Sequence, residues 1–147
     1  LALSRQGMAQ FRHGDMGENK TAKGGYIITG DEASRQVTLV ATGSEVGIAL
    51  AARDTLAKDG IAASVVSMPC MELFRAQEPA YQQAVLGSTP RVVIEAAMQQ
   101  SWDWMLALGD TFIGMDGFGA SAPIKDLYAH FGITEDAVVA AVRQRLA

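Results

Sequence analysis

A chain of 147 residues with 49% hydrophobic and 19% charged side chains is long enough to bury a core and too apolar to be disordered. Its net charge of −4 argues against nucleic acid or an anionic membrane as the main partner, although one local positive site could still hold a small anion. The single cysteine, Cys70, excludes an intrachain disulfide and a cysteine zinc cluster. No apolar run is long enough to span a membrane and the first residues do not form a signal peptide, so we expect a cytoplasmic protein. Because the chain begins with Leu1 rather than Met, we expect it to be part of a longer one.

The first two dozen residues differ in composition from the rest. After an apolar start at 1–4, which reads as the end of a strand, residues 5–24 are polar and rich in glycine, as in a linker. From there on, short apolar runs alternate with helical patterns. The runs predict strands at 25–29, 37–42, 62–68, 91–97 and 111–115. The patterns between and after them predict helices from about 43 to 59, at 71–77, 79–86, 101–108 and 123–130, and from 135 to the end.

Strands that are apolar on both faces and alternate with helices indicate a mostly parallel sheet covered on both sides. We therefore predict a three-layer α/β/α domain with about five strands, of which one could be antiparallel. The last helix has clear signals: Thr134 is expected to cap its start, and Gly132 to end the helix before it. Its expected apolar stripe is Val138, Ala141, Val142 and Leu146.

The loop after the second strand, Thr42-Gly43-Ser44-Glu45, has the outline of a phosphate-binding turn. A dinucleotide fingerprint needs glycines at G-x-G-x-x-G spacing, and a P-loop needs a lysine, whereas this loop has only Gly43 and Gly47. Thr42 and Glu45 instead match a capping box, in which each side chain accepts a hydrogen bond from a backbone N–H at the helix start. We interpret the loop as a structural join.

Other polar and aromatic groups could be functional. Cys70 could stand at a helix start that activates its thiol, although single cysteines are more often buried apolar residues. His13, Asp15 and Glu18 could be metal ligands, but their setting favours a solvated loop. His130 is expected to interact with a helix dipole. Trp102 and Trp104 should lie on different sides of a helix, one in the core and the other free to face a partner. The glycine-rich stretch 114–123 could bind an anion through its amides, but we interpret it as a connection.

Taken in order, these segments resemble the C-terminal domain of transketolase. The matching stretches are "LALSRQ" (1–6), "KGGYIIT" (23–29), "VTLVATGSEV" (37–46), "VVSMPCMELFRAQ" (65–77), "RVVIEA" (91–96), "FGASAP" (118–123) and "LYAHFGIT" (127–134). The resemblance covers essentially the whole chain. It departs from many members at Met71, at 81–87 and at 98–108.

The resemblance implies an enzyme that transfers two-carbon ketol units between sugar phosphates as a homodimer, with thiamine diphosphate and Mg²⁺ as cofactors. In the family, two other domains hold that cofactor through a Gly-Asp-Gly motif with a downstream Asn and through a glutamate. Asn19, the only asparagine here, lies upstream of both Asp-Gly pairs. We therefore expect this chain to bind no cofactor or metal and to carry no catalytic residue. Its expected role is to support the other domains and the dimer.

One functional residue is carried over by the resemblance. The arginine of "LALSRQ", here Arg5, belongs in the family to the last strand of the preceding domain and helps to bind the substrate phosphate. We accordingly expect residues 1–22 to be the end of that domain and a linker, and residues 23–147 to be the C-terminal domain. Two alternatives from other classes are a flavodoxin-like module that binds a nucleotide or other anion at 42–44 or 117–120, and a thiol enzyme that uses Cys70.

Overall fold

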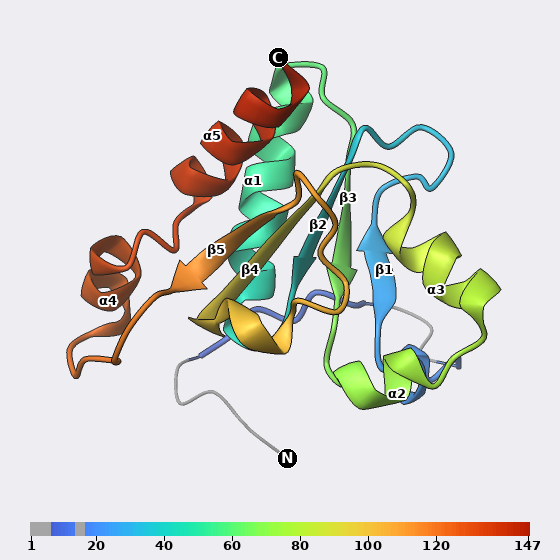
Figure 1. Cartoon of the computed structure of the whole chain (residues 1–147), viewed down its shortest axis with the longest axis horizontal. Coiled ribbons are helices and arrows are strands. Elements are labelled where there is room, and N and C mark those ends of the chain that lie inside the picture. The colour runs from blue at the N-terminus through green and yellow to red at the C-terminus, as the bar shows by residue number, and fades with distance from the viewer. Residues whose placement is uncertain (1–6, 14–16) are drawn as a thin grey trace.

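The computed structural model describes residues 7–13 and 17–147, and in this part the chain forms a three-layer α/β/α domain (Figure 1). Five strands make one sheet in the order β1-β3-β2-β4-β5. Their bounds are β1 Tyr26–Thr29, β2 Val37–Ala41, β3 Ala63–Ser67, β4 Arg91–Met98 and β5 Thr111–Met115. β2 to β5 are parallel, and β1 is antiparallel to β3. The predicted fold class, with one antiparallel strand, is confirmed.

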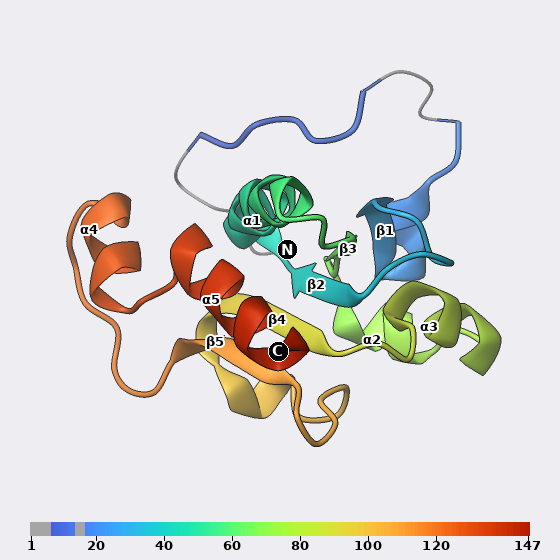
Figure 2. The ribbon, with the colours of Figure 1, turned by 90° about the horizontal axis from the view of Figure 1, so that it is seen from above.

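The helices cover the sheet on both faces (Figure 2). On one face, α1 (Val46–Lys58) and α5 (Glu135–Leu146) pack against each other. On the other lie α2 (Met71–Arg75) and α3 (Pro79–Leu86), while α4 (Ile124–His130) stands beyond the end of β5. Short 3₁₀ helices are η1 (Lys20–Lys23), η2 (Gly43–Glu45) and η3 (Gln99–Ser101). Within the described residues, no helix has the length and apolar character needed to cross a bilayer.

The two faces of the sheet bury separate apolar clusters. Cluster 1 lies under α1 and α5 and includes Leu39, Val65 and Ile94; cluster 2 lies on the opposite face and includes Val40, Val66 and Phe74. Every residue of β2 and β3 is buried, as expected for central parallel strands. Three hydroxyl residues are among them, Thr38, Ser64 and Ser67. The Thr38 hydroxyl donates to the backbone oxygen of Leu86 at 3.0 Å.

The predicted helix at 101–108 is wrong. The segment has one 3₁₀ turn, η3, followed by irregular turns up to Asp110. The reason is that tertiary hydrogen bonds use its backbone groups: the Arg91 guanidinium donates to the Met105 oxygen, and the Asp110 carboxylate accepts from the Ala107 N–H at 2.9 Å. Asp110 also accepts from the Arg91 N–H at 2.9 Å. These hydrogen bonds fix the segment against the start of β4 and replace the regular i to i−4 backbone hydrogen bonds of a helix.

Trp102 and Trp104 therefore do not lie on one helix. Trp102 is the largest fully buried side chain, in agreement with the expectation that one of the pair is in the core. Trp104 is only half-buried, but it packs against the same cluster, with its ring 6.2 Å from that of Phe74 and the Arg75 guanidinium carbon 5.4 Å from its centroid. Both indoles thus contribute to cluster 2, and a contact of one of them with a partner stays a prediction.

The C-terminal signals are confirmed. The Thr134 hydroxyl accepts from the Ala137 N–H at 3.2 Å and caps α5, and Gly132 has a φ of +68° directly after α4. Val138 and Val142 are buried as predicted, and Val139 is buried as well. Leu146 is more exposed than the apolar stripe implied.

Candidate functional site

The order of the strands places a topological switch point between β2 and β4. From β2 the chain passes through α1 to β3 on one side, and from β3 it passes through α2 and α3 to β4 on the other side of β2. Open α/β sheets bind their ligands in the crevice that such a divergence leaves outside the carboxyl ends of the strands. The residues that follow Ala41 and Ile94, which are paired in the sheet, are therefore the first candidates for function.

The loop after β2 is a join, but it is not the predicted capping box. The Thr42 side chain makes no capping hydrogen bond, because the chain first turns through η2, in which the Glu45 N–H bonds to the Thr42 backbone oxygen at 3.2 Å. Gly43 allows this tight turn with a φ of +53°. Glu45 is only 4% exposed. Its carboxylate accepts from the Tyr128 hydroxyl at 2.8 Å and from the Ser44 hydroxyl at 3.2 Å.

A second carboxyl group, Glu95 on β4, lies close enough to Glu45 for the two charges to repel. Burial, and then the Glu45 charge, raise the pKa of Glu95 to about 7. Its Oε2 is buried and finds no hydrogen-bond partner among the described residues. Burial is also the main cause that raises the pKa of Tyr128 to about 12, so this phenol stays protonated and can donate to Glu45. We call Ser44, Glu45, Glu95 and Tyr128 the carboxylate cluster.

The carboxylate cluster can exchange a proton near neutral pH, and it disfavours an anionic ligand. A phosphate at the start of α1 would meet the buried Glu45 charge, and the 42–45 loop offers no lysine to offset it. No group of three or more His, Cys, Asp or Glu side chains within residues 7–13 and 17–147 could hold a metal ion. The flavodoxin-like alternative, with nucleotide or anion bound at 42–44, therefore has no support beyond the shared type of fold.

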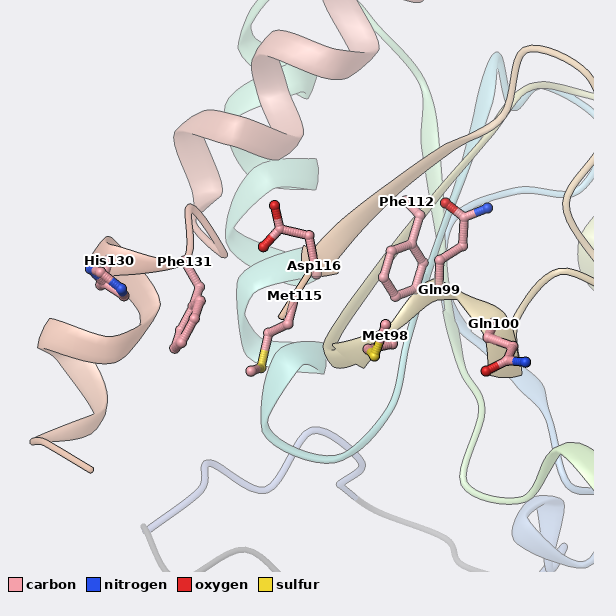
Figure 3. A pocket seen from close by; sticks show the side chains of 9 residues that line it. Met98, Gln99, Gln100, Phe112, Met115, Asp116, His130 and Phe131 are labelled. Atoms are coloured by element: carbon pink, nitrogen blue, oxygen red, sulfur yellow. The ribbon is translucent and has the colours of Figure 1, made fainter. Parts of the chain in front are cut away.

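A groove of about 630 Å³ lies between the end of β5, η3 and the end of α4 (Figure 3). Apolar side chains from three elements point toward it, with Phe131 of the α4 end facing Met115 of β5. Gln99 and Gln100 close it at the η3 side. The residues that line it are Met98, Gln99, Gln100, Phe112, Gly114, Met115, Asp116, His130 and Phe131. Asp116 and His130 are the titratable side chains in this lining, and the other lining residues are apolar or uncharged.

The other sequence candidates do not come together. Arg5 and Asp15 lie outside the described residues, His13 is exposed, and the Glu18 carboxylate pairs with the Lys23 ammonium at 3.6 Å. Cys70 does stand at the start of α2, but its Sγ lies 3.5 Å from a carboxylate oxygen of Glu72 rather than beside a cation. That surrounding does not support a thiol enzyme. His130 ends α4, as predicted, and the stretch after β5 is an exposed connection.

Comparison with known proteins gives one consistent result. Residues 24–134 match the model of the "Transketolase-like TK C-terminal domain" family. The chain is 53% identical to the transketolase of Cereibacter sphaeroides over 99% of its own length and 22% of that protein, and 43% identical to the chloroplastic transketolase of Solanum tuberosum over 98% and 20%. It thus spans about a fifth of the length of the curated relatives it matches.

Solved structures agree. Transketolase from Leishmania mexicana superimposes with a TM-score of 0.77 at 42% identity, covering 84% of this chain and 18% of that one. A second structure is titled "Split gene transketolase, inactive beta4 tetramer", in which beta4 refers to that assembly and not to a strand. It superimposes with a TM-score of 0.68 over 97% of this chain and 48% of that one, and at 20% identity it shows the shared fold alone. The resemblance seen in the sequence is confirmed: the chain belongs to the transketolase family and corresponds to the C-terminal domain of its members.

Proposed function

We propose that this chain completes an enzyme that transfers two-carbon ketol units between sugar phosphates, with thiamine diphosphate and Mg²⁺ held by its other domains. The observation that carries the proposal is 53% identity to a transketolase over nearly the whole of this chain. Related structures from Pichia stipitis, 30% identical, are titled as complexes with sedoheptulose-7-phosphate and fructose-6-phosphate, which supports sugar phosphates as substrates. A cytoplasmic location is part of the proposal, supported by the single unpaired Cys70.

The proposed role of the domain is architectural: it supports the catalytic domains and contributes to a homodimer. Residues 23–147 form the domain in this proposal, and residues 1–22 are the end of the preceding domain and a linker. The start of the sheet at Tyr26 supports the boundary, and the match of residues 24–134 to the family of transketolase-like C-terminal domains supports the role. The test is to express the full-length protein and assay ketol transfer with and without thiamine diphosphate. Absence of cofactor-dependent transfer would overturn the proposal.

Arg5 is the proposed anchor for the substrate phosphate in that full-length enzyme. A guanidinium stays charged and can donate two parallel hydrogen bonds to phosphate oxygens. Losing such a contact costs about 1.5–3 kcal/mol, so Arg5→Ala should raise KM for phosphorylated acceptors by roughly 10- to 150-fold. The effect on kcat should be smaller, because the phosphate is remote from the reacting carbons.

The control for Arg5 is an acceptor without a phosphate, such as glycolaldehyde. Its KM should not change in Arg5→Ala, and Arg5→Lys should restore only part of the loss with phosphorylated acceptors, since a point charge cannot form the two-pronged contact. Equal slowing of both acceptor classes would show that Arg5 acts on the fold or the cofactor site instead.

A further inference from the structure

Exposed apolar side chains of this domain are concentrated at the carboxyl end of its sheet. The large hydrophobic residues that remain exposed in the described part of the chain are Met8, Leu73, Met98, Leu108, Phe118, Ile124 and Leu146. Of these, only Leu108 and Leu146 belong to segments at the opposite, amino end of the parallel strands. Single exposed apolar residues need no explanation, but several gathered on one end of a domain indicate a contact surface.

Phe118 shows the effect most clearly. Its side chain is 100% exposed in the connection from β5 to α4, so it buries no surface within the domain. Met98, at the carboxyl end of β4, is 54% exposed and lines the groove of about 630 Å³. Met115 and Phe131 face each other across the same groove (Figure 3). An apolar floor with Gln99, Gln100 and His130 at its borders suits a polypeptide segment that brings both apolar side chains and backbone polar groups.

The edge of the sheet beside the groove also lacks a partner. β5 pairs with β4 along one side, and no strand of the described residues pairs with its other side. An open strand edge presents backbone N–H and C=O groups that a neighbouring chain can use. The groove therefore offers both an apolar floor and an unpaired backbone.

The chain that precedes this domain arrives at the same end. Residues 7–13 lie at the level of the carboxyl ends of the strands in Figure 1 and pass outside α1 in Figure 2. Phe11 packs against cluster 1 beside Gly47 in the first turn of α1, and the Arg12 guanidinium carbon lies 5.3 Å from the centre of the Tyr26 ring. These two contacts hold the linker to the domain. The described part of the linker therefore lies at the exposed apolar end of the domain and not at the amino end.

We propose that the carboxyl end of the sheet is the surface against which the upstream part of the same transketolase polypeptide packs, and that one of its segments occupies the groove between β5 and α4. The inference rests on the proposed function, since about four-fifths of the relatives' length lies outside this chain. A short tether keeps the upstream part at an effective concentration in the millimolar range, which favours contact within one subunit over contact with a free partner.

A photo-crosslinking experiment on the full-length protein tests this proposal. p-Benzoylphenylalanine replaces Phe118 in one variant, Met98 in a second, and Leu108 in a third as the matched control. Phe118 and Leu108 are both fully exposed, at 100% and 103%, so neither replacement disturbs the core. After irradiation, the products are separated on a denaturing gel and the joined peptides are identified by mass spectrometry.

The expected result is a crosslink at positions 118 and 98 to peptides upstream of residue 1, in a product that keeps the mass of one chain, and no such crosslink at position 108. A product with the mass of two chains would assign the surface to the partner subunit and overturn the proposal. Equal labelling of all three positions, or none, would overturn it as well. Ketol transfer measured on the same preparations separates the two hypotheses: an active enzyme without the crosslink refutes only the contact surface, and an inactive enzyme with the crosslink refutes only the proposed function.

Discussion

Replacing Glu95 by glutamine should remove a pH-dependent loss of stability. Burial and the Glu45 charge raise the pKa of Glu95 from 4.5 to about 7 in the folded domain, so between these values the folded state holds a proton that the unfolded chain has released. Stability therefore decreases as pH rises through this window. A shift of that size corresponds to at most about 3 kcal/mol. Because the side chain is only half-buried, solvent screens part of this, and we expect about 1–2 kcal/mol.

Urea unfolding of this chain at several pH values between 4.5 and 8 measures the effect. The free energy of unfolding of the wild type should fall relative to that of Glu95→Gln by about 1–2 kcal/mol across the window, because the amide cannot ionise. The exposed Glu78 provides the matched control, since Glu78→Gln removes the same charge from solvent. Glu45→Gln should move the step to lower pH by removing the repelling charge. A difference between wild type and Glu95→Gln that stays flat with pH would refute the reasoning.

Two further predictions concern the same chain. Thr134→Ala should lower the free energy of unfolding by about 0.5–2 kcal/mol, because it removes the cap of α5. Thr42→Ala should lower it by less than about 0.5 kcal/mol, because the Thr42 hydroxyl caps no helix. Equal losses for the two variants in urea titrations would contradict the observed caps. The chain alone should melt cooperatively and show no heat of binding with thiamine diphosphate and Mg²⁺ in calorimetry. Micromolar affinity for the cofactor would contradict the proposal that the other domains bind it.

The parallel sheet could be predicted because its strands carry a local signal. The apolar run of β2 needs burial on both faces, and only a covered sheet supplies it. The segment around Trp102 carried a helical pattern as well, yet the contacts of Arg91 and Asp110 determined its path. Those contacts depend on where β4 begins, which no local window contains.

The carboxylate cluster could be predicted only in part. A glutamate directly after the buried run of β4 is a visible signal, since charged residues rarely follow such a run without a reason. Its pairing with Glu45 depends on β2 and β4 being neighbours, a matter of topology rather than of sequence spacing. The same holds for Tyr128, whose hydroxyl comes from the opposite end of the chain.

The hydroxyl of Thr38 has a consequence for how the sheet chooses its alignment. In a strand that alternates apolar and polar residues, a slip by one position turns the wrong face inward and is rejected at once. β2 is apolar on both faces, so its hydrophobic pattern would tolerate such a slip. Thr38 would not, because its buried hydroxyl would lose the Leu86 oxygen and remain unpaired, at a cost of about 1–3 kcal/mol. A single polar atom thus distinguishes the correct alignment from its neighbours, and Thr38→Val should leave the strand well packed but less uniquely placed.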